Sequence, residues 1–279
     1  MGRPVMRDSR RPGLARAVMP ILVLAVFAVF AAPMVLVLLG SLRPTGTAPP
    51  TTFDLLLAGA DSSNYGDVLG RSSFRRQAIN SLLVAAIAVP AGTIVASWAG
   101  FAIARLPRRA ALLLLGLTLV AATIPASTLF VGRLALFRLT GLTDSPVPLI
   151  APALIGVSPL LVLLFAWSYF TISRDTYDLA WEAGLGPFRT WWFVALPIRM
   201  PVAVVAAAIA FMLSWGNLTD PLLYVYDERW FTLPLGLASL AALPPTDHGL
   251  MLAAALLATA PALVTAVLVQ RFVSDRRWA

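Results

Sequence analysis

The sequence predicts an all-α, polytopic membrane protein with six transmembrane helices. Of its 279 residues, 59% are apolar and only 12% are charged, whereas a soluble domain carries about 25% charged residues. A membrane-spanning helix needs about 20 predominantly apolar residues, and six stretches of that kind contain no Asp, Glu, Lys or Arg. Their ranges are 17–40, 77–104, 110–132, 146–173, 200–219 and 249–270.

The first stretch is expected to be a retained span that follows a cytoplasmic tail of residues 1–16. Its apolar part is longer than the 7–15 residues of a signal peptide. The later spans carry Pro90, Pro125, Pro159 and Pro261, each of which frees a backbone carbonyl and favours a kink within a packed bundle. The apolar run 231–243 is only 13 residues long and is interrupted by Pro234, so it is too short to cross and we expect an interfacial or re-entrant segment. A single transmembrane domain then covers 17–273, and residues 274–279 form a second tail.

Arginine counts predict the orientation of these spans. Every one of the 21 basic residues is arginine, and 14 of them fall in segments 1–16, 105–109, 174–199 and 271–279, together with five acids. By the positive-inside rule, both termini are cytoplasmic. This distribution explains the net charge of +8 without a nucleic-acid partner. Arg71, Arg75 and Arg76 fall on the outer side, where they either snorkel to the membrane surface or contact another protein.

The composition also excludes several classes of chemistry. The chain has no cysteine, no lysine and one histidine, His248, which excludes disulfides, thiolate metal sites and the lysine of a Walker A loop. We therefore expect no metal, no cofactor and no enzymatic activity. Charge-free spans disfavour ion-coupled carriers, which use buried ionisable groups. Four polar residues of the spans are expected either to line a path for an uncharged polar solute or to pack between helices: Asn80, Ser127, Ser214 and Asn217.

The predicted cytoplasmic loop 174–199 has the pattern of a helix, a stop and a second helix. Asp175 or Thr176 is expected to cap the first helix, and Asp178 places negative charge near its start. Gly184 occupies the position of a left-handed C-terminal cap. Gly186-Pro187 then prevents the helix from continuing.

This loop resembles the EAA loop of bacterial ABC-importer permeases. The family pattern is E-A-A, three residues, G, nine residues and I-x-L-P; the matching residues here are Asp178-Leu179-Ala180, Gly184 and Val194-Ala195-Leu196-Pro197. The spacing agrees throughout, although Asp178 replaces the family's Glu and Leu179 its first Ala. The resemblance implies that the loop couples the chain to an ATPase through the following residues: Asp178, Ala180, Trp181, Glu182, Gly184, Leu196 and Pro197.

Further segments resemble the maltose-type permeases of carbohydrate importers. They include Asn80-Ser81-Leu82, Gly100–Arg105, Gly141–Asp144 and Phe231–Ala238. The resemblance implies a permease subunit in the bacterial cytoplasmic membrane, translocating a sugar or related polar solute by alternating access. It also implies a second homologous permease subunit, two ATP-binding cassette ATPase subunits that bind the ATP and magnesium, and an extracytoplasmic solute-binding protein.

Two other classes of function compete with this interpretation. A membrane-embedded transferase would need paired acids near the interface, for which Asp220, Asp227 and Glu228 are the candidates. A passive channel would need only a polar path through the spans. Adjacent genes for a second permease and a binding protein would favour the importer.

Overall fold

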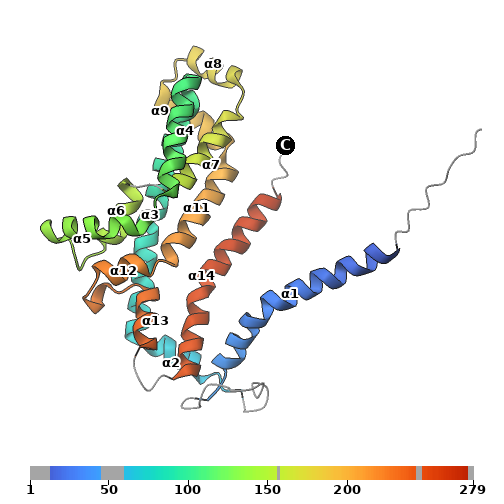
Figure 1. Cartoon of the computed structure of the whole chain (residues 1–279), viewed down its shortest axis with the longest axis vertical. Coiled ribbons are helices and arrows are strands. Elements are labelled where there is room, and N and C mark those ends of the chain that lie inside the picture. Colours follow the sequence, from blue (N-terminus) through green and yellow to red (C-terminus); the bar gives the residue numbers. More distant parts are fainter. Residues whose placement is uncertain (1–12, 45–59, 156–157, 243–246, 276–279) are drawn as a thin grey trace, which may run out of the picture. The chain divides into compact units, whose positions relative to one another are not determined.

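The computed structural model describes residues 13–44, 60–155, 158–242 and 247–275, and every regular element in these ranges is a helix (Figure 1). The helices of the first half of the chain are α1 (Gly13–Ser41), α2 (Ser63–Gly70), α3 (Ser72–Arg105), α4 (Arg108–Thr123), the 3-10 helix η2 (Ala126–Leu129), α5 (Phe130–Leu139), α6 (Val147–Ile155) and α7 (Pro159–Phe170). Those of the second half are α8 (Arg174–Glu182), α9 (Pro187–Thr190), the π-helix η3 (Trp191–Ala195), α10 (Leu196–Ile198), α11 (Met200–Trp215), α12 (Thr219–Tyr224), the 3-10 helix η4 (Glu228–Trp230), α13 (Leu233–Ala241) and α14 (His248–Asp275). The predicted all-α membrane fold is confirmed.

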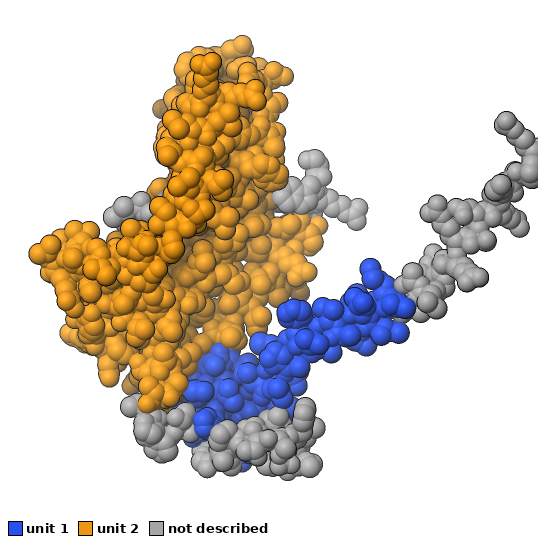
Figure 2. Space-filling view, in the orientation of Figure 1, with its two compact units in different colours: residues 1–68, 247–256 blue, residues 69–246, 257–279 orange. Residues whose placement is uncertain are grey.

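The chain divides into two compact units, coloured separately in Figure 2. Unit 1 comprises residues 1–68 and 247–256, and its polar contacts centre on the buried Asn64. The amide nitrogen of Asn64 donates to the carbonyl oxygens of Ser41 and Arg43 at 3.0 and 2.7 Å, and the hydroxyls of Ser41 and Tyr65 lie 2.6 Å apart. These bonds fix the end of α1 to α2, whereas the apolar side chains of α1 between Val18 and Leu38 are mostly exposed, as expected of a lipid-facing helix.

Unit 2 comprises residues 69–246 and 257–279 and is built around the 34-residue helix α3. Small residues on α3 allow α6 and α7 to approach its backbone closely. A Cβ on Gly100 would lie 2.6 Å from the Cβ of Phe165 and 2.7 Å from the backbone nitrogen of Ala166, and one on Gly92 would lie 3.7 Å from the Cβ of Ala153. Close helix packing of this kind is typical of membrane proteins.

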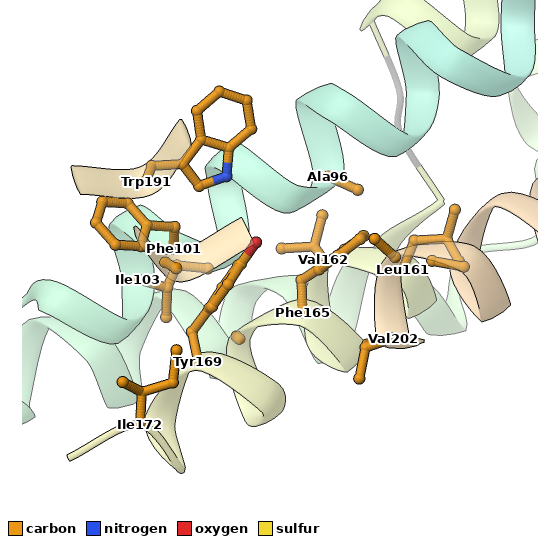
Figure 3. Packing of buried hydrophobic residues seen from close by; sticks show 14 of the residues in the cluster. Ala96, Phe101, Ile103, Leu161, Val162, Phe165, Tyr169, Ile172, Trp191 and Val202 are labelled. Atoms are coloured by element: carbon orange, nitrogen blue, oxygen red, sulfur yellow. The ribbon is translucent and has the colours of Figure 1, made fainter. Parts of the chain in front are cut away.

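The core of unit 2 is an apolar cluster contributed mainly by α3, α7, η3 and α11, with Ala111 of α4 and Tyr177 of α8. Figure 3 shows Phe101, Tyr169 and Trp191 grouped at one end of this cluster and Leu161 and Val202 at the other. A polar triad lies within it. The hydroxyl of Ser97 is 2.6 Å from that of Tyr169 and accepts a hydrogen bond of 3.0 Å from the indole nitrogen of Trp191. The triad therefore links α3, α7 and η3 inside the core.

Three helical segments in the described residues are long and apolar enough to cross a membrane: Val18–Ser41, Ser72–Arg105 and His248–Ser274. Two further candidates are bent pairs, Arg108–Thr123 with Ala126–Leu139 at 86° and Pro187–Ile198 with Met200–Trp215 at 88°. The predicted stretch 146–173 is divided between α6 and α7. The structure therefore does not test whether the chain crosses the membrane six times, and the number and boundaries of the spans stay predictions. Proline explains one of the breaks, since Pro125 lies in the 86° bend and cannot continue α4.

The end of unit 2 that carries α12 and α13 is held by two polar side chains (Figure 1). Asp144, at a φ of 57°, accepts hydrogen bonds from the backbone nitrogens of Tyr226 and Asp227 at 2.5 and 2.8 Å. Ser81 accepts from the backbone nitrogen of Leu233 at 2.8 Å. The nine-residue α13 corresponds to most of the predicted short segment 231–243. These bonds order the chain between α12 and α13.

Candidate functional site

The loop predicted to couple the chain to an ATPase begins with α8, at the end of unit 2 opposite α12 and α13 (Figure 1). The predicted cap at Asp175 or Thr176 is wrong: the N-cap residue is Ser173, and its side chain makes no capping hydrogen bond. Instead, the hydroxyls of Ser173 and Thr176 lie 2.7 Å apart. Asp175 falls within the first turn, where its charge favours the helix N-terminus.

The predicted left-handed stop at Gly184 is confirmed, since its φ is 74°. The backbone nitrogen of Gly184 donates to the carbonyl of Trp181 at 2.9 Å, and that of Leu185 donates to the carbonyl of Ala180 at 3.0 Å. These two bonds form a Schellman motif, which satisfies carbonyls that a helix end leaves unpaired. Pro187 then begins α9 after Gly186. The reversal of the chain is thus a defined local structure.

Tyr177 anchors α8 to the core of unit 2. Its side chain is buried, its ring centroid lies 6.0 Å from that of Phe101, and its hydroxyl donates to the carbonyl of Tyr169 at 3.3 Å. The guanidinium carbon of Arg105 lies 4.3 Å from the ring centroid, which is cation–π geometry. Burial raises the pKa of the Tyr177 phenol to about 12. The hydroxyl therefore keeps its proton near neutral pH and remains a donor.

The opposite side of α8 is exposed and carries both acidic and apolar groups. Asp178 and Glu182 are exposed, and so are Leu179 and Trp181, the latter to 70%. Ala180, by contrast, is buried beside Tyr177 on the inner side. Of the residues predicted to contact an ATPase, Asp178, Trp181, Glu182 and Gly184 thus share an accessible surface, whereas Ala180 contributes to the anchoring of the helix.

The second part of the loop is fixed by its own contacts. Thr190 and Trp191 are buried, and the Thr190 hydroxyl donates to the carbonyl of Leu185 at 3.3 Å. The guanidinium of Arg199 donates to the hydroxyl of Thr171 at 2.7 Å, which joins the two ends of the loop. Leu196 and Pro197 lie in α10, directly before the 88° bend into α11. Leu196 is half-buried there, whereas Pro197 is exposed.

The four polar residues predicted to line a path or to pack have different surroundings. The amide nitrogen of Asn80 donates to the carbonyls of Arg229 and Phe231 at 2.8 and 3.0 Å, so Asn80 holds the segment before α13. Ser127 is exposed within η2. Ser214 and Asn217, however, both line a cavity of about 340 Å³ inside unit 2.

The cavity is walled by α3, α6, α7, α11 and α12 and by single residues beside them. Its apolar wall consists largely of small or aliphatic residues, including Ala88 and Gly92. Its polar residues are Ser158, Ser214, Asn217, Asp220 and Thr232. None of the residues that line it is aromatic or basic.

Asp220 and Asn217 form the best-defined polar pair of this cavity. The amide nitrogen of Asn217 donates to Oδ2 of Asp220 at 2.8 Å, and its amide oxygen accepts from the backbone nitrogen of Asp220 at 3.1 Å. Arg133 Nη1 lies 3.9 Å from Oδ1 of Asp220. Asp220 thus has a charge partner in a confined place. The sequence did not indicate that Asp220 or Thr232 would line this cavity, because these residues meet Ala88 only through the folding of distant segments.

The acids considered for a transferase do not form a ligand cluster. Asp227 pairs with Arg229 at 2.6 Å, and hydrogen bonds from Arg229 lower the pKa of the Asp227 carboxyl. Asp220 pairs instead with Asn217 and Arg133. Among the described residues there is no group of three or more His, Cys, Asp or Glu side chains that could hold a metal ion.

Comparison with curated proteins gives a consistent set of relatives, although no family model matches the chain. It is 25% identical over 233 residues to the trehalose transport system permease protein SugB of Mycobacterium tuberculosis, covering 83% of this chain and 84% of SugB. It is 24% identical over 274 residues to the arabinooligosaccharides transport system permease protein AraQ of Bacillus subtilis, covering 96% of both. The probable ABC transporter permease protein YurM of Bacillus subtilis is 22% identical over 194 residues, which are 70% of this chain and 65% of YurM.

Solved structures share the fold at low sequence identity. A bacterial ABC transporter involved in the import of the acidic polysaccharide alginate contains a chain that superposes with a TM-score of 0.75 and 17% identity, covering 97% of this chain and 99% of that one. A chain from the alginate transporter in complex with an alginate-bound periplasmic protein gives a TM-score of 0.65 and 12% identity, covering 95% and 94%. The chain has the fold of an ABC-importer permease, and its predicted resemblance to the permeases of carbohydrate ABC importers is confirmed.

Proposed function

We propose that this chain is the membrane-spanning permease subunit of an importer in the bacterial cytoplasmic membrane. It moves a sugar or a related polar solute by alternating access, with both termini in the cytoplasm. It works with a second permease, two ATPase subunits and an external solute-binding protein. Named relatives that transport trehalose and arabinooligosaccharides support a carbohydrate as the solute, and a neighbour solved with its periplasmic protein supports the external partner.

The observation that carries this proposal is that α8 is packed against the core on one side and exposed on the other. Its inner side is fixed through Tyr177 to Phe101 on α3 and to Tyr169 on α7, whereas its outer side presents Trp181 and Glu182 to a partner. A helix held in this way transmits a push on its outer side to the two helices that anchor it, because packed interiors deform little. This arrangement of α8 supports a role for the loop as a mechanical coupler.

The energy for transport is assigned to the partner ATPase. The chain has no lysine, so it has no side chain for the phosphate-binding position of a Walker A loop. Asp178 and Glu182 give the exposed side of α8 negative charge that is complementary to a basic cleft. Movement of that cleft during ATP hydrolysis would shift α8 and, through Tyr177, the core of unit 2.

Reconstitution tests this function directly. The chain would be co-expressed with its neighbouring genes, purified with the subunits that accompany it and placed in proteoliposomes with ATP inside. Lactose, trehalose, arabinotriose and an alginate trisaccharide would be offered outside together with the binding protein. We expect ATP-dependent uptake of at least one neutral sugar. Uptake without ATP or without an ATPase subunit would contradict the proposal.

A further inference from the structure

The cavity in unit 2 contains a polar group that the protein itself leaves without a partner. Thr232 is only 5% exposed, and its hydroxyl forms no hydrogen bond with any part of the chain that the structure describes. It lines the same cavity as Ser214, Asn217 and Asp220. Buried hydroxyls are nearly always hydrogen-bonded, and an unpaired one needs an explanation. A bound ligand would supply the missing partner.

Asp220 has acceptor capacity to spare at the same place. A carboxylate offers about four lone-pair positions. The protein uses one for the amide of Asn217, and Arg133 lies at 3.9 Å from the other oxygen. The side chain is 14% exposed, so the remaining positions are open to a neighbouring donor. Hydroxyl groups of a ligand are suitable donors, because each can also accept in turn from Asn217 or Thr232.

The lining also determines which class of ligand fits. A volume of about 340 Å³ lies at the lower end of the range for small-molecule sites. None of the lining residues is basic or aromatic. The cavity therefore offers a phosphate or carboxylate no direct cation and offers a planar base no ring on which to stack. Its acceptors and hydroxyls match a compact, neutral molecule that carries several hydroxyl groups.

We infer that this cavity binds one neutral, monosaccharide-sized unit of the transported solute, with Asp220, Asn217 and Thr232 as its hydrogen-bonding residues. The inference rests on the proposed function and adds to it that this subunit itself holds part of the solute. The permease then selects for uncharged hydroxylated units inside the membrane domain, after the solute has left the external binding protein.

Thr232→Val provides the most discriminating kinetic test. Valine has nearly the same shape, so if the hydroxyl has only a packing role, its removal leaves folding and uptake unchanged or improves stability. If it binds the sugar, the concentration for half-maximal uptake by the reconstituted complex rises about fivefold, the effect of one lost hydrogen bond, while the maximal rate changes little. Thr118→Val is the matched control, because Thr118 is half-buried on α4, does not line the cavity, and its hydroxyl already donates to the carbonyl of Leu114 at 2.7 Å.

Cysteine protection gives an independent measurement, since the chain has no native cysteine. Ala210 lines the cavity, whereas Ala208, two residues earlier on α11, does not. Ala210→Cys and Ala208→Cys would be labelled with aminoethyl methanethiosulfonate in the purified complex, with and without the transported neutral sugar. We expect the sugar to slow labelling at position 210 and to leave position 208 unchanged. The alginate trisaccharide, which is acidic, should protect neither position.

The outcomes separate the inference from the proposed function. If the wild-type complex takes up a neutral sugar but either Thr232→Val leaves the half-maximal concentration unchanged or position 210 is not protected, the cavity site is wrong and the proposed function stands. If the wild-type complex takes up no sugar with ATP, the proposed function fails. In that case, protection of position 210 by lactose, trehalose or arabinotriose in the purified chain would show whether the cavity binds a sugar.

Discussion

Gly184 has its role because of its backbone conformation and not because of crowding. Its φ is 74°, and a Cβ at this position would meet no atom within 4 Å. A side chain therefore has room within the chain but is strained, because L-residues rarely adopt positive φ. The tight end of α8 and the direction in which α9 leaves depend on this one residue.

Replacing Gly184 should therefore destabilise the loop in proportion to backbone strain. We expect Gly184→Ala to cost about 1 kcal/mol, Gly184→Asn to cost less, and Gly184→Val to abolish uptake while the protein still inserts. Gly186→Ala is the control, since Gly186 has a φ of −67° and equally open surroundings. Thermal unfolding in detergent and sugar uptake would measure these effects. Full uptake with Gly184→Val would remove the coupling role from this loop.

At Gly100, by contrast, steric crowding determines the cost of adding a side chain. A Cβ there would lie 2.6 to 2.9 Å from the Cβ and backbone carbon of Phe165 and the nitrogen of Ala166. We expect Gly100→Ala to lower stability by about 1–3 kcal/mol, because α3 and α7 must separate. Gly116→Ala, on α4 with nothing within 4 Å, should be neutral or stabilising. The comparison of the two unfolding midpoints checks this, and equal midpoints would show that the α3–α7 contact is loose.

At the scale of elements, sequence reasoning succeeded where the signals are local. The end of α8 was predictable because Gly184, Gly186 and Pro187 each restrict the backbone within a few residues. Its start was not, because several polar residues competed for the cap and the helix begins at Arg174 after an N-cap residue, Ser173, that makes no side-chain bond. The stretch 146–173 was predicted as one span with a kink favoured at Pro159, and hydropathy, which is continuous across it, did not indicate two separate helices, of which α7 begins at Pro159.

The Tyr169 hydroxyl joins α7 to Ser97 on α3, the same residue that accepts the bond from η3. Tyr169→Phe keeps the ring but removes the bond to Ser97, and we expect a loss of about 1 kcal/mol of stability. Proteolysis within residues 174–199 should become faster, because the core beneath the loop loosens. Tyr226→Phe also removes one hydroxyl bond, to the carbonyl of Leu223, but on an exposed residue, and it should change stability by less than about 0.5 kcal/mol. Equal effects of the two substitutions would contradict a linking role for the buried triad.

At the scale of the whole molecule, composition predicted the class of protein better than it predicted the site. The absence of charge from six stretches is a property of the sequence itself, and it sufficed for a polytopic helical fold. The cavity could not be foreseen, because Val84 on α3, Leu149 on α6 and Thr232 before α13 come together only in the folded chain. Ser214 and Asn217 were singled out for their polarity, which a packing role would have explained equally well.

Orientation in the membrane gives the last prediction. The arginine distribution predicts that α8 and the end of α14 lie in the cytoplasm and that the segment before α2 lies outside. Because the chain has no cysteine, single substitutions report one position each. We expect Ser62→Cys to react with an impermeant maleimide in intact spheroplasts, and Thr176→Cys and Ser274→Cys to react only after permeabilisation. The permeabilised sample is the control that each thiol is accessible at all. Labelling of Thr176→Cys in intact spheroplasts would place α8 outside, where no ATP-driven partner could reach it, and would overturn both the topology and the coupling role.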